Sequence, residues 1–177
     1  MTRTRAIAAL VALSGAVAAV VAYRVRRVAS DEIGAGYVLG DYLVTGQSFE
    51  FPPVPDDVFN NLKRSASAQG AINDAVGGRG YITSGWRPPD LNEAIGGVAT
   101  SSHLTGLGTD RRPVLGDSIA EARAAVEAFR AQRIDWDQVI AYHPTRGGHV
   151  HVGLSTGKGR KQLLLAGEFG GYVTLED

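Results

Sequence analysis

Two stretches of the chain carry apolar residues at the spacing of one helix face. The first begins at Asp56 or Asp57, either of which can cap a helix, and ends before a run of glycines that starts at Gly77. The second follows the capping residue Asp117, and we expect its polar side, including Glu121, to face water. The apolar faces consist of Val58, Phe59, Leu62 and Ala66 in the first stretch and Ile119, Ala122, Val126 and Phe129 in the second. The pattern predicts two amphipathic helices.

Shorter apolar stretches predict strands around these helices. Pro88 and Pro89 interrupt this pattern, and Asp90 can cap a short helix that continues through Ile95. The other segments are strands at 81–83, 134–142 and 149–154, a loosely alternating strand or docking segment at 37–44, and a closing helical turn or strand at 163–166. Separate helices mixed with short strands are typical of the α+β class.

The N-terminal segment has a different pattern. Residues 6–23 are uncharged and mostly Ala, Val and Leu, with arginines on both sides. As a helix this segment would be roughly 27 Å long, close to a bilayer core of about 30 Å. We therefore predict one transmembrane helix, a signal anchor at 1–27, then a linker at 28–36 and one domain at 37–177. A cleaved signal peptide and a buried helix are the alternatives for the first segment.

Composition limits the chemistry. The 177-residue chain has a formal net charge of zero, so bulk charge gives no reason to expect a nucleic-acid partner. It has no cysteine, which excludes disulfides and thiolate metal sites. A transition metal would therefore need His, Asp or Glu ligands.

The stretch from Ser101 to Asp110 brings an imidazole close to a carboxylate. His103 and Asp110 are separated by a segment with two glycines, which lets the backbone fold tightly. His149 and His151 lie on a later predicted strand, where residues two apart point to the same face, so both can reach one pocket. Two His and one Asp leave the fourth position of a tetrahedral zinc open for water, as in catalytic sites.

The order of the short motifs resembles that of a known family. The motifs are Ser84-Gly85-Trp86-Arg87, Leu91-Asn92, Gly96-Gly97, Ser101-x-His103-x6-Asp110 and Val150-His151-Val152. Together they resemble the zinc D-alanyl-D-alanine carboxypeptidase family, within the LAS-type peptidases of bacterial cell walls and phage lysins. The similarity covers about residues 37–166. It implies a small antiparallel sheet with helices packed around it, the D-Ala-D-Ala carboxypeptidase or hedgehog-like fold.

The resemblance also implies roles for individual residues. His103, Asp110 and His151 match the zinc ligands. Arg87 matches an arginine that lies beside the metal and stabilises the substrate's carbonyl or developing oxyanion. Ser101 matches a serine that hydrogen-bonds the substrate peptide. The implied cofactor is Zn²⁺, which acidifies water for attack on an amide carbon.

The chain departs from the family pattern at the catalytic carboxylate, which normally precedes the last histidine. The two candidate positions hold Gly148 and Tyr142, which are not acids. A peptidase without a base loses about 10²–10⁴ in rate. Asp137, His143 and His149 are possible replacements, and we select His149 because a strand position predicts its face. The alternative is that His149 is only a partly exposed strand residue.

A second departure follows the presumed ligand Asp110. Arg111 and Arg112 stand where the family usually has an apolar strand residue. Two charges predict that this strand ends early or lies at the edge of the sheet.

These observations predict a zinc-dependent peptidase that cleaves peptidoglycan stem peptides at a bond involving D-alanine. Its role would be cell-wall remodelling, or phage lysis and wall penetration as an endolysin. The N-terminal helix would hold it in the membrane with the domain outside the cytoplasm, on the periplasmic or cell-wall side, or the protein would be exported. The alternative is a non-catalytic wall-binding or structural envelope protein that retains a degenerate zinc site.

Overall fold

The computed structural model describes residues 29–175. The predicted anchor at 1–27 lies outside these residues, and within 29–175 no helix is long and apolar enough to cross a membrane. The elements are β1 (Glu32–Gly34), β2 (Tyr37–Val38), α2 (Leu39–Tyr42), α3 (Asp56–Val76), β3 (Tyr81–Ser84), α4 (Pro89–Ala94), η1 (Ser102–Thr105), β4 (Gly108–Arg112), α5 (Ser118–Gln132), β5 (Trp136–Tyr142), η2 (Pro144–Arg146), β6 (Val150–Leu154), β7 (Gln162–Ala166) and β8 (Tyr172–Thr174).

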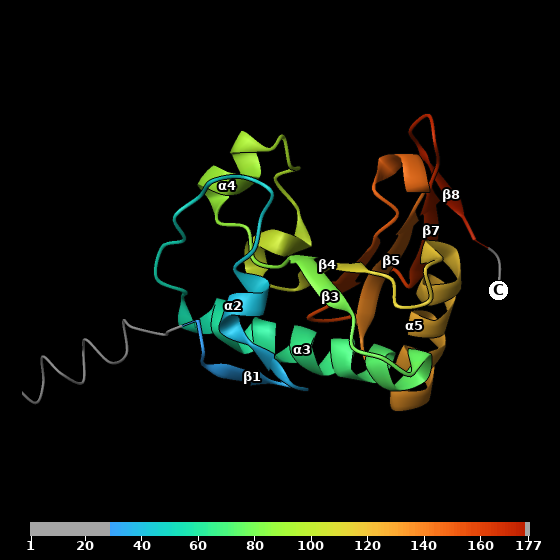
Figure 1. Cartoon of the computed structure of the whole chain (residues 1–177), viewed down its shortest axis with the longest axis horizontal. Helices are drawn as coiled ribbons and strands as arrows, with labels where there is room; N and C mark the ends of the chain where they lie inside the picture. Colours follow the sequence, from blue (N-terminus) through green and yellow to red (C-terminus); the bar gives the residue numbers. More distant parts are fainter. Residues whose placement is uncertain (1–28, 176–177) are drawn as a thin grey trace, which may run out of the picture.

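Six strands form the main sheet, in the order β3-β4-β6-β5-β7-β8 (Figure 1). Neighbouring strands are antiparallel except β5 and β7, which are parallel. The chain leaves β6 through a loop at 155–161 and reverses, so β7 runs in the direction of β5 and joins its free edge. The α+β class is confirmed. The prediction of an antiparallel sheet is correct except for the pair β5 and β7, which is parallel.

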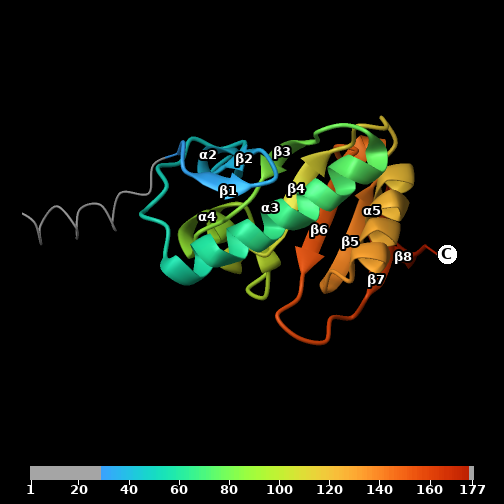
Figure 2. The same cartoon turned by 90° about the horizontal axis from the view of Figure 1, so that it is seen from below.

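The two predicted helices are α3 and α5, and both cover the same face of the sheet (Figure 2). The Asp117 carboxylate caps α5 by accepting hydrogen bonds from the backbone N–H groups of Ile119 and Ala120, at 2.7 and 3.2 Å. In α3 the cap is Pro55, and the two predicted capping aspartates lie in the first turn, where they favour the helix dipole. The largest core cluster joins these helices to β5 and β6.

Strand alternation separates the sheet into a helix-covered face and a face that lines a cleft. On β6, Val150 and Val152 pack into the core, whereas His151 lines the cleft. On β5, Val139 belongs to the core and Ile140 lines the cleft. The period of two along each strand therefore positions polar side chains on one face of an otherwise apolar sheet.

The expectation that the strand after Asp110 lies at an edge is wrong. β4 is paired on both sides, with β3 and β6, and it contains both arginines. The Arg111 side chain is fully buried under the helices, with Nε 2.8 Å from a Glu121 carboxylate oxygen and Nη1 donating to Gln69 at 2.7 Å. Glu121, which was expected to face water, is buried as well, because it pairs with Arg111. The ion pair offsets both charges, which lets a charged residue occupy an interior strand.

Smaller differences concern segment boundaries. The segment at 37–44 divides into β2 and α2, and 163–166 lies in a strand, β7. Asp90 lies in the first turn of α4 rather than at its cap, which is Pro88. Strand β8 was not expected, because its three residues are too few to show an alternating pattern and all of them are exposed.

Candidate metal centre

Strand register places the carboxylate and one imidazole side by side. Asp110 on β4 is directly opposite His151 on β6. Directly opposite residues have Cβ atoms about 4.5–5.5 Å apart on the same face of an antiparallel pair. The His151 Nδ1 atom lies 2.8 Å from an Asp110 carboxylate oxygen. Two elements distant in sequence therefore supply adjacent donors.

The second imidazole comes from the short helix η1. Gly106 ends η1 with φ +76°, a conformation that side chains rarely adopt. A Cβ at Gly108 would lie 2.5 Å from the Ser102 hydroxyl and 2.6 Å from the His103 backbone nitrogen. Glycine at 108 therefore lets η1 pack directly on β4. This contact places the His103 ring over Asp110.

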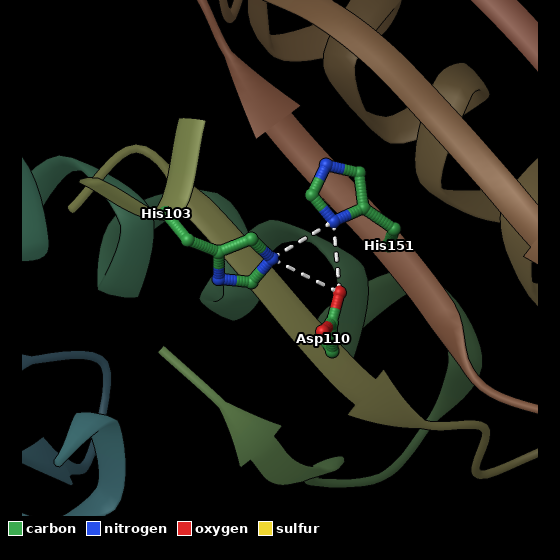
Figure 3. Close-up of side chains that lie close together, drawn as sticks. All are labelled: His103, Asp110 and His151. Atoms are coloured by element: carbon green, nitrogen blue, oxygen red, sulfur yellow. Dashed lines mark hydrogen bonds and ion pairs between the residues drawn. The ribbon is translucent and has the colours of Figure 1, made fainter. Parts of the chain in front are cut away.

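Three donor atoms meet at this point, as Figure 3 shows. The His103 Nε2 atom lies 3.2 Å from Asp110 Oδ1 and 3.2 Å from His151 Nδ1. Tetrahedral zinc with bonds of about 2.0–2.1 Å holds neighbouring ligand atoms about 3.3 Å apart. The nitrogen–nitrogen–oxygen set thus has the chemistry and the spacing that suit a zinc ion.

The ring orientations agree with this fit. The other nitrogen of His103, Nδ1, lies 2.6 Å from the Gly85 carbonyl oxygen, which can only accept, so Nδ1 carries the proton. That hydrogen bond leaves Nε2 unprotonated for a metal. The Nε2 atom of His151 lies 3.4 Å from the Ser102 hydroxyl, on the side away from Asp110.

Protonation also favours metal binding. Burial lowers the pKa of His103, against the opposing attraction of Asp110, so the neutral imidazole is favoured. For Asp110, burial alone would raise the pKa, but the electrostatic attraction of the neighbouring His103 and His151 outweighs burial and holds it well below its ordinary range. Neutral imidazoles and an ionised carboxylate are the states that bind a divalent cation.

Arg87 lies beside the donor group. Its Nη2 atom is 2.5 Å from the Asp110 oxygen that faces away from the histidines, and its Nε atom donates to the Ser84 hydroxyl at 2.8 Å. The Arg87 backbone N–H donates to the His103 carbonyl at 3.1 Å. The guanidinium is thus fixed against the carboxylate on the floor of the cleft.

The donors open into a cleft of about 660 Å³. One wall is formed by residues between Ile95 and Ser102, and the other includes Tyr142 of β5, Arg146 of η2 and Tyr172 of β8. Ser101 lines this cleft and caps η1, where its hydroxyl accepts weakly from the His103 N–H at 3.4 Å.

His149 also lines the cleft but lies outside the donor group. Its ring stacks on Tyr142, with centroids 4.1 Å apart and planes at 16°. Burial lowers the pKa of His149. The structure therefore gives the two histidines different positions: His151 joins His103 and Asp110, the group that the resemblance implies, and His149 lines the cleft beside them.

The other candidate proton carriers are less well placed. Asp137 lines the cleft, but Arg160 pairs with it at 2.5 Å, and the hydrogen bond from Arg160 lowers the pKa of Asp137 despite its partial burial. The His143 ring bonds to the Thr145 hydroxyl at 2.8 Å and does not line the cleft. Gly148 has φ +56° and no side chain to offer.

Two contributors escaped sequence reasoning. The Ser102 hydroxyl contacts His151, and the Gly85 carbonyl orients His103. Ser102 is adjacent to the candidate Ser101, but its role depends on the register between η1 and β6. A backbone carbonyl carries no residue-specific signal at all.

Fold and donors together define an α+β protein with a metal-binding His–Asp–His group on the open face of its sheet. The family model for Peptidase M15 matches residues 54–152, more than half of the chain and including all the candidate site residues. The chain therefore belongs to the M15 peptidases, a zinc D-alanyl-D-alanine carboxypeptidase-like family, which confirms the resemblance found in the sequence. M15 peptidases are zinc-dependent, as predicted for this chain. No curated protein matches it.

Proposed function

We propose that this protein is a zinc peptidase that cleaves peptidoglycan stem peptides at a bond involving D-alanine. The observation that carries the proposal is the convergence of His103, Asp110 and His151 in a cleft, within a chain of the M15 family. We assign these three residues as the zinc ligands. Zinc bound there supplies an acidified water and a positive charge for the scissile carbonyl.

Arg87 is assigned to the substrate carbonyl and its developing oxyanion. The guanidinium is held by Asp110 and Ser84 through Nη2 and Nε, which leaves Nη1 without a hydrogen bond to the described residues. A guanidinium stays charged at any working pH, so it donates to a carbonyl oxygen in both ground and transition states. Ser101, on the facing wall, is assigned to a backbone group of the peptide.

His149 is assigned as the proton carrier that replaces the family's carboxylate. It directly precedes β6, lines the same cleft as His151 and is held by its stack on Tyr142. From that position it accepts a proton from the attacking water and delivers it to the leaving amine. Asp137 is a poorer base because Arg160 holds its carboxylate.

We further propose that the N-terminal segment anchors the protein in a membrane with the domain on the cell-wall side. This proposal rests on the uncharged run at 6–23 between arginines. Its partners would then be the peptides of the wall. Fractionation of cells expressing the chain, followed by protease treatment from outside, tests the location.

The enzymatic proposal is tested with the full chain loaded with zinc and incubated with purified muropeptides. Mass spectrometry should show loss or separation of D-alanine that stops when a chelator removes the metal. No zinc-dependent cleavage of any bond would contradict the proposal. Binding to sacculi without cleavage would instead favour the second candidate, a non-catalytic wall-binding protein, which the absence of an acid at Gly148 and Tyr142 motivates.

A further inference from the structure

The cleft is lined by three arginines, and two of them are occupied by aspartates of the same cleft. Arg87 pairs with Asp110, and Arg160 pairs with Asp137. Arg146 has no acidic partner among residues 29–175. The lining therefore carries one cationic side chain whose charge no neighbouring carboxylate offsets.

Arg146 is an exposed residue whose guanidinium contacts an aromatic ring rather than a carboxylate. It ends η2, where its backbone N–H donates to the His143 carbonyl at 2.8 Å, and Gly147 closes the turn with φ +95°. Its guanidinium carbon lies 5.4 Å from the centre of the Tyr142 ring, a cation–π distance. The same ring is stacked on His149. Arg146, Tyr142 and His149 thus form a connected group along one wall.

Strand geometry gives the offset of this wall from the metal-binding group. Ile140 pairs with His151, and Tyr142 lies two residues further along β5, roughly 7 Å away at about 3.4 Å per residue. An extended peptide advances by about the same length per residue. A substrate carbonyl beside the donor group would therefore place a side chain about two residues away within reach of Arg146.

We propose that Arg146 binds a carboxylate located inside the substrate peptide, about two residues from the cleaved bond. The inference rests on the proposed peptidase function and adds to it the substrate's charge pattern. A guanidinium recognises a carboxylate through paired hydrogen bonds, and here it does so without first breaking an internal ion pair. Stem peptides that contain an acidic residue before their terminal D-alanines meet this requirement.

The test uses the zinc-loaded full chain and three synthetic pentapeptides that end in D-Ala-D-Ala. One has all carboxylates free, one has the internal carboxylate replaced by a carboxamide, and one has the terminal carboxylate replaced instead. Binding is measured by calorimetry and hydrolysis by chromatography of the products. We compare the parent chain with Arg146→Gln, Arg146→Lys and, as a matched control, Arg133→Gln at the exposed end of α5.

Arg146→Gln should raise KM for the free-acid peptide about 10- to 100-fold, with kcat nearly unchanged. It should leave KM for the internal carboxamide peptide unchanged, Arg146→Lys should restore part of the loss, and Arg133→Gln should match the parent. The inference would be overturned if Arg146→Gln raised KM equally for the free-acid peptide and the internal carboxamide peptide. It would also be overturned if the increase in KM disappeared with the peptide that lacks the terminal carboxylate. In both cases the peptidase function would stand. A parent chain that neither binds nor cleaves any of the three peptides would refute the function itself, and this inference with it.

Discussion

Asp110 and Arg111 are neighbours on β4, both are buried and both carry a charge, but they face opposite sides of the sheet. Arg111 points under the helices, where Glu121 lies 2.8 Å away and both side chains are fully buried. Asp110 points to the open face, where it meets two imidazoles and a guanidinium at the floor of a cleft. Two consecutive residues of β4 thus belong to different kinds of group: Arg111 to a closed ion pair, and Asp110 to a set of donor atoms that can bind one cation.

The difference shows what distinguishes a functional charge from a structural one. Burial does not make the distinction, because Asp110 and Arg111 are both buried. The presence of a charged partner does not make it either, because each of them has one. In the closed pair each charge is offset by one opposite charge, and nothing else can enter. On the open face three donor atoms, two nitrogens and one oxygen, lie within 3.2 Å of one another next to the cleft, an arrangement that a cation completes.

Removing a donor on the open face should have the largest effect. In His103→Ala, bound zinc should fall from about one ion per chain to nearly none, and peptidase activity should be lost, because two ligands hold zinc poorly. Elemental analysis after dialysis measures this. His143→Ala is the control, since within residues 29–175 that ring makes its hydrogen bonds to Thr145. Full zinc retention by the His103 variant would show that the ligand assignment is wrong.

Removing His149 should separate metal binding from catalysis. In His149→Gln, kcat should fall about 10²–10⁴-fold with the zinc content unchanged, because His149 stands beside the donor group and not in it. Steady-state kinetics with parallel metal analysis measure both. Tyr142→Phe keeps the stacked ring and should retain most activity. An unchanged kcat in His149→Gln would require another proton carrier, with Asp137 next to be tested.

Breaking the closed pair should affect stability and leave the metal site intact. Glu121→Ala leaves Arg111 buried without its counter-charge, so the free energy of unfolding should fall by about 3–5 kcal/mol. Urea denaturation measures it, with Glu127→Ala, an exposed partner of Arg130 on the same helix, as the control. The double variant Arg111→Met, Glu121→Leu should recover most of the loss. A single-variant effect no larger than that of the control would contradict a structural role for the pair.

The smallest effect concerns the orientation of His151. Ser102→Ala should weaken zinc binding about 10- to 100-fold, because its hydroxyl contacts the ring nitrogen that faces away from Asp110. Competition with a chromophoric chelator measures the affinity. Ser101→Ala should change peptide KM and leave the zinc affinity nearly unchanged. Equal zinc affinities in the Ser102 variant and the parent would show that the Ser102 hydroxyl does not orient His151 for the metal. The Gly85 carbonyl would then be the remaining contact that orients a ligand ring.

Local sequence determined the helices and most strands. Helical spacing of apolar residues and the cap at Asp117 define α3 and α5, because both signals are confined to neighbouring residues. It also determined the candidate donors, since the chain has no cysteine and only four histidines. The family match follows from the same motifs in the same order.

Tertiary structure decided what depends on contacts between distant segments. The two arginines predicted a strand that ends early or lies at an edge, and Glu121 was expected to face water. Both predictions failed because a charged side chain can be buried when an opposite charge lies beside it, and here that partner comes from another element. Strand alternation alone let both His149 and His151 reach the pocket, and only the family resemblance selected His151 as a ligand. In the structure, the pairing of Asp110 with His151 across β4 and β6 brings His151, and not His149, into the donor group. Residue type therefore fixed the chemistry available, and strand register fixed which side chains meet, because register is set by the packing of the whole sheet.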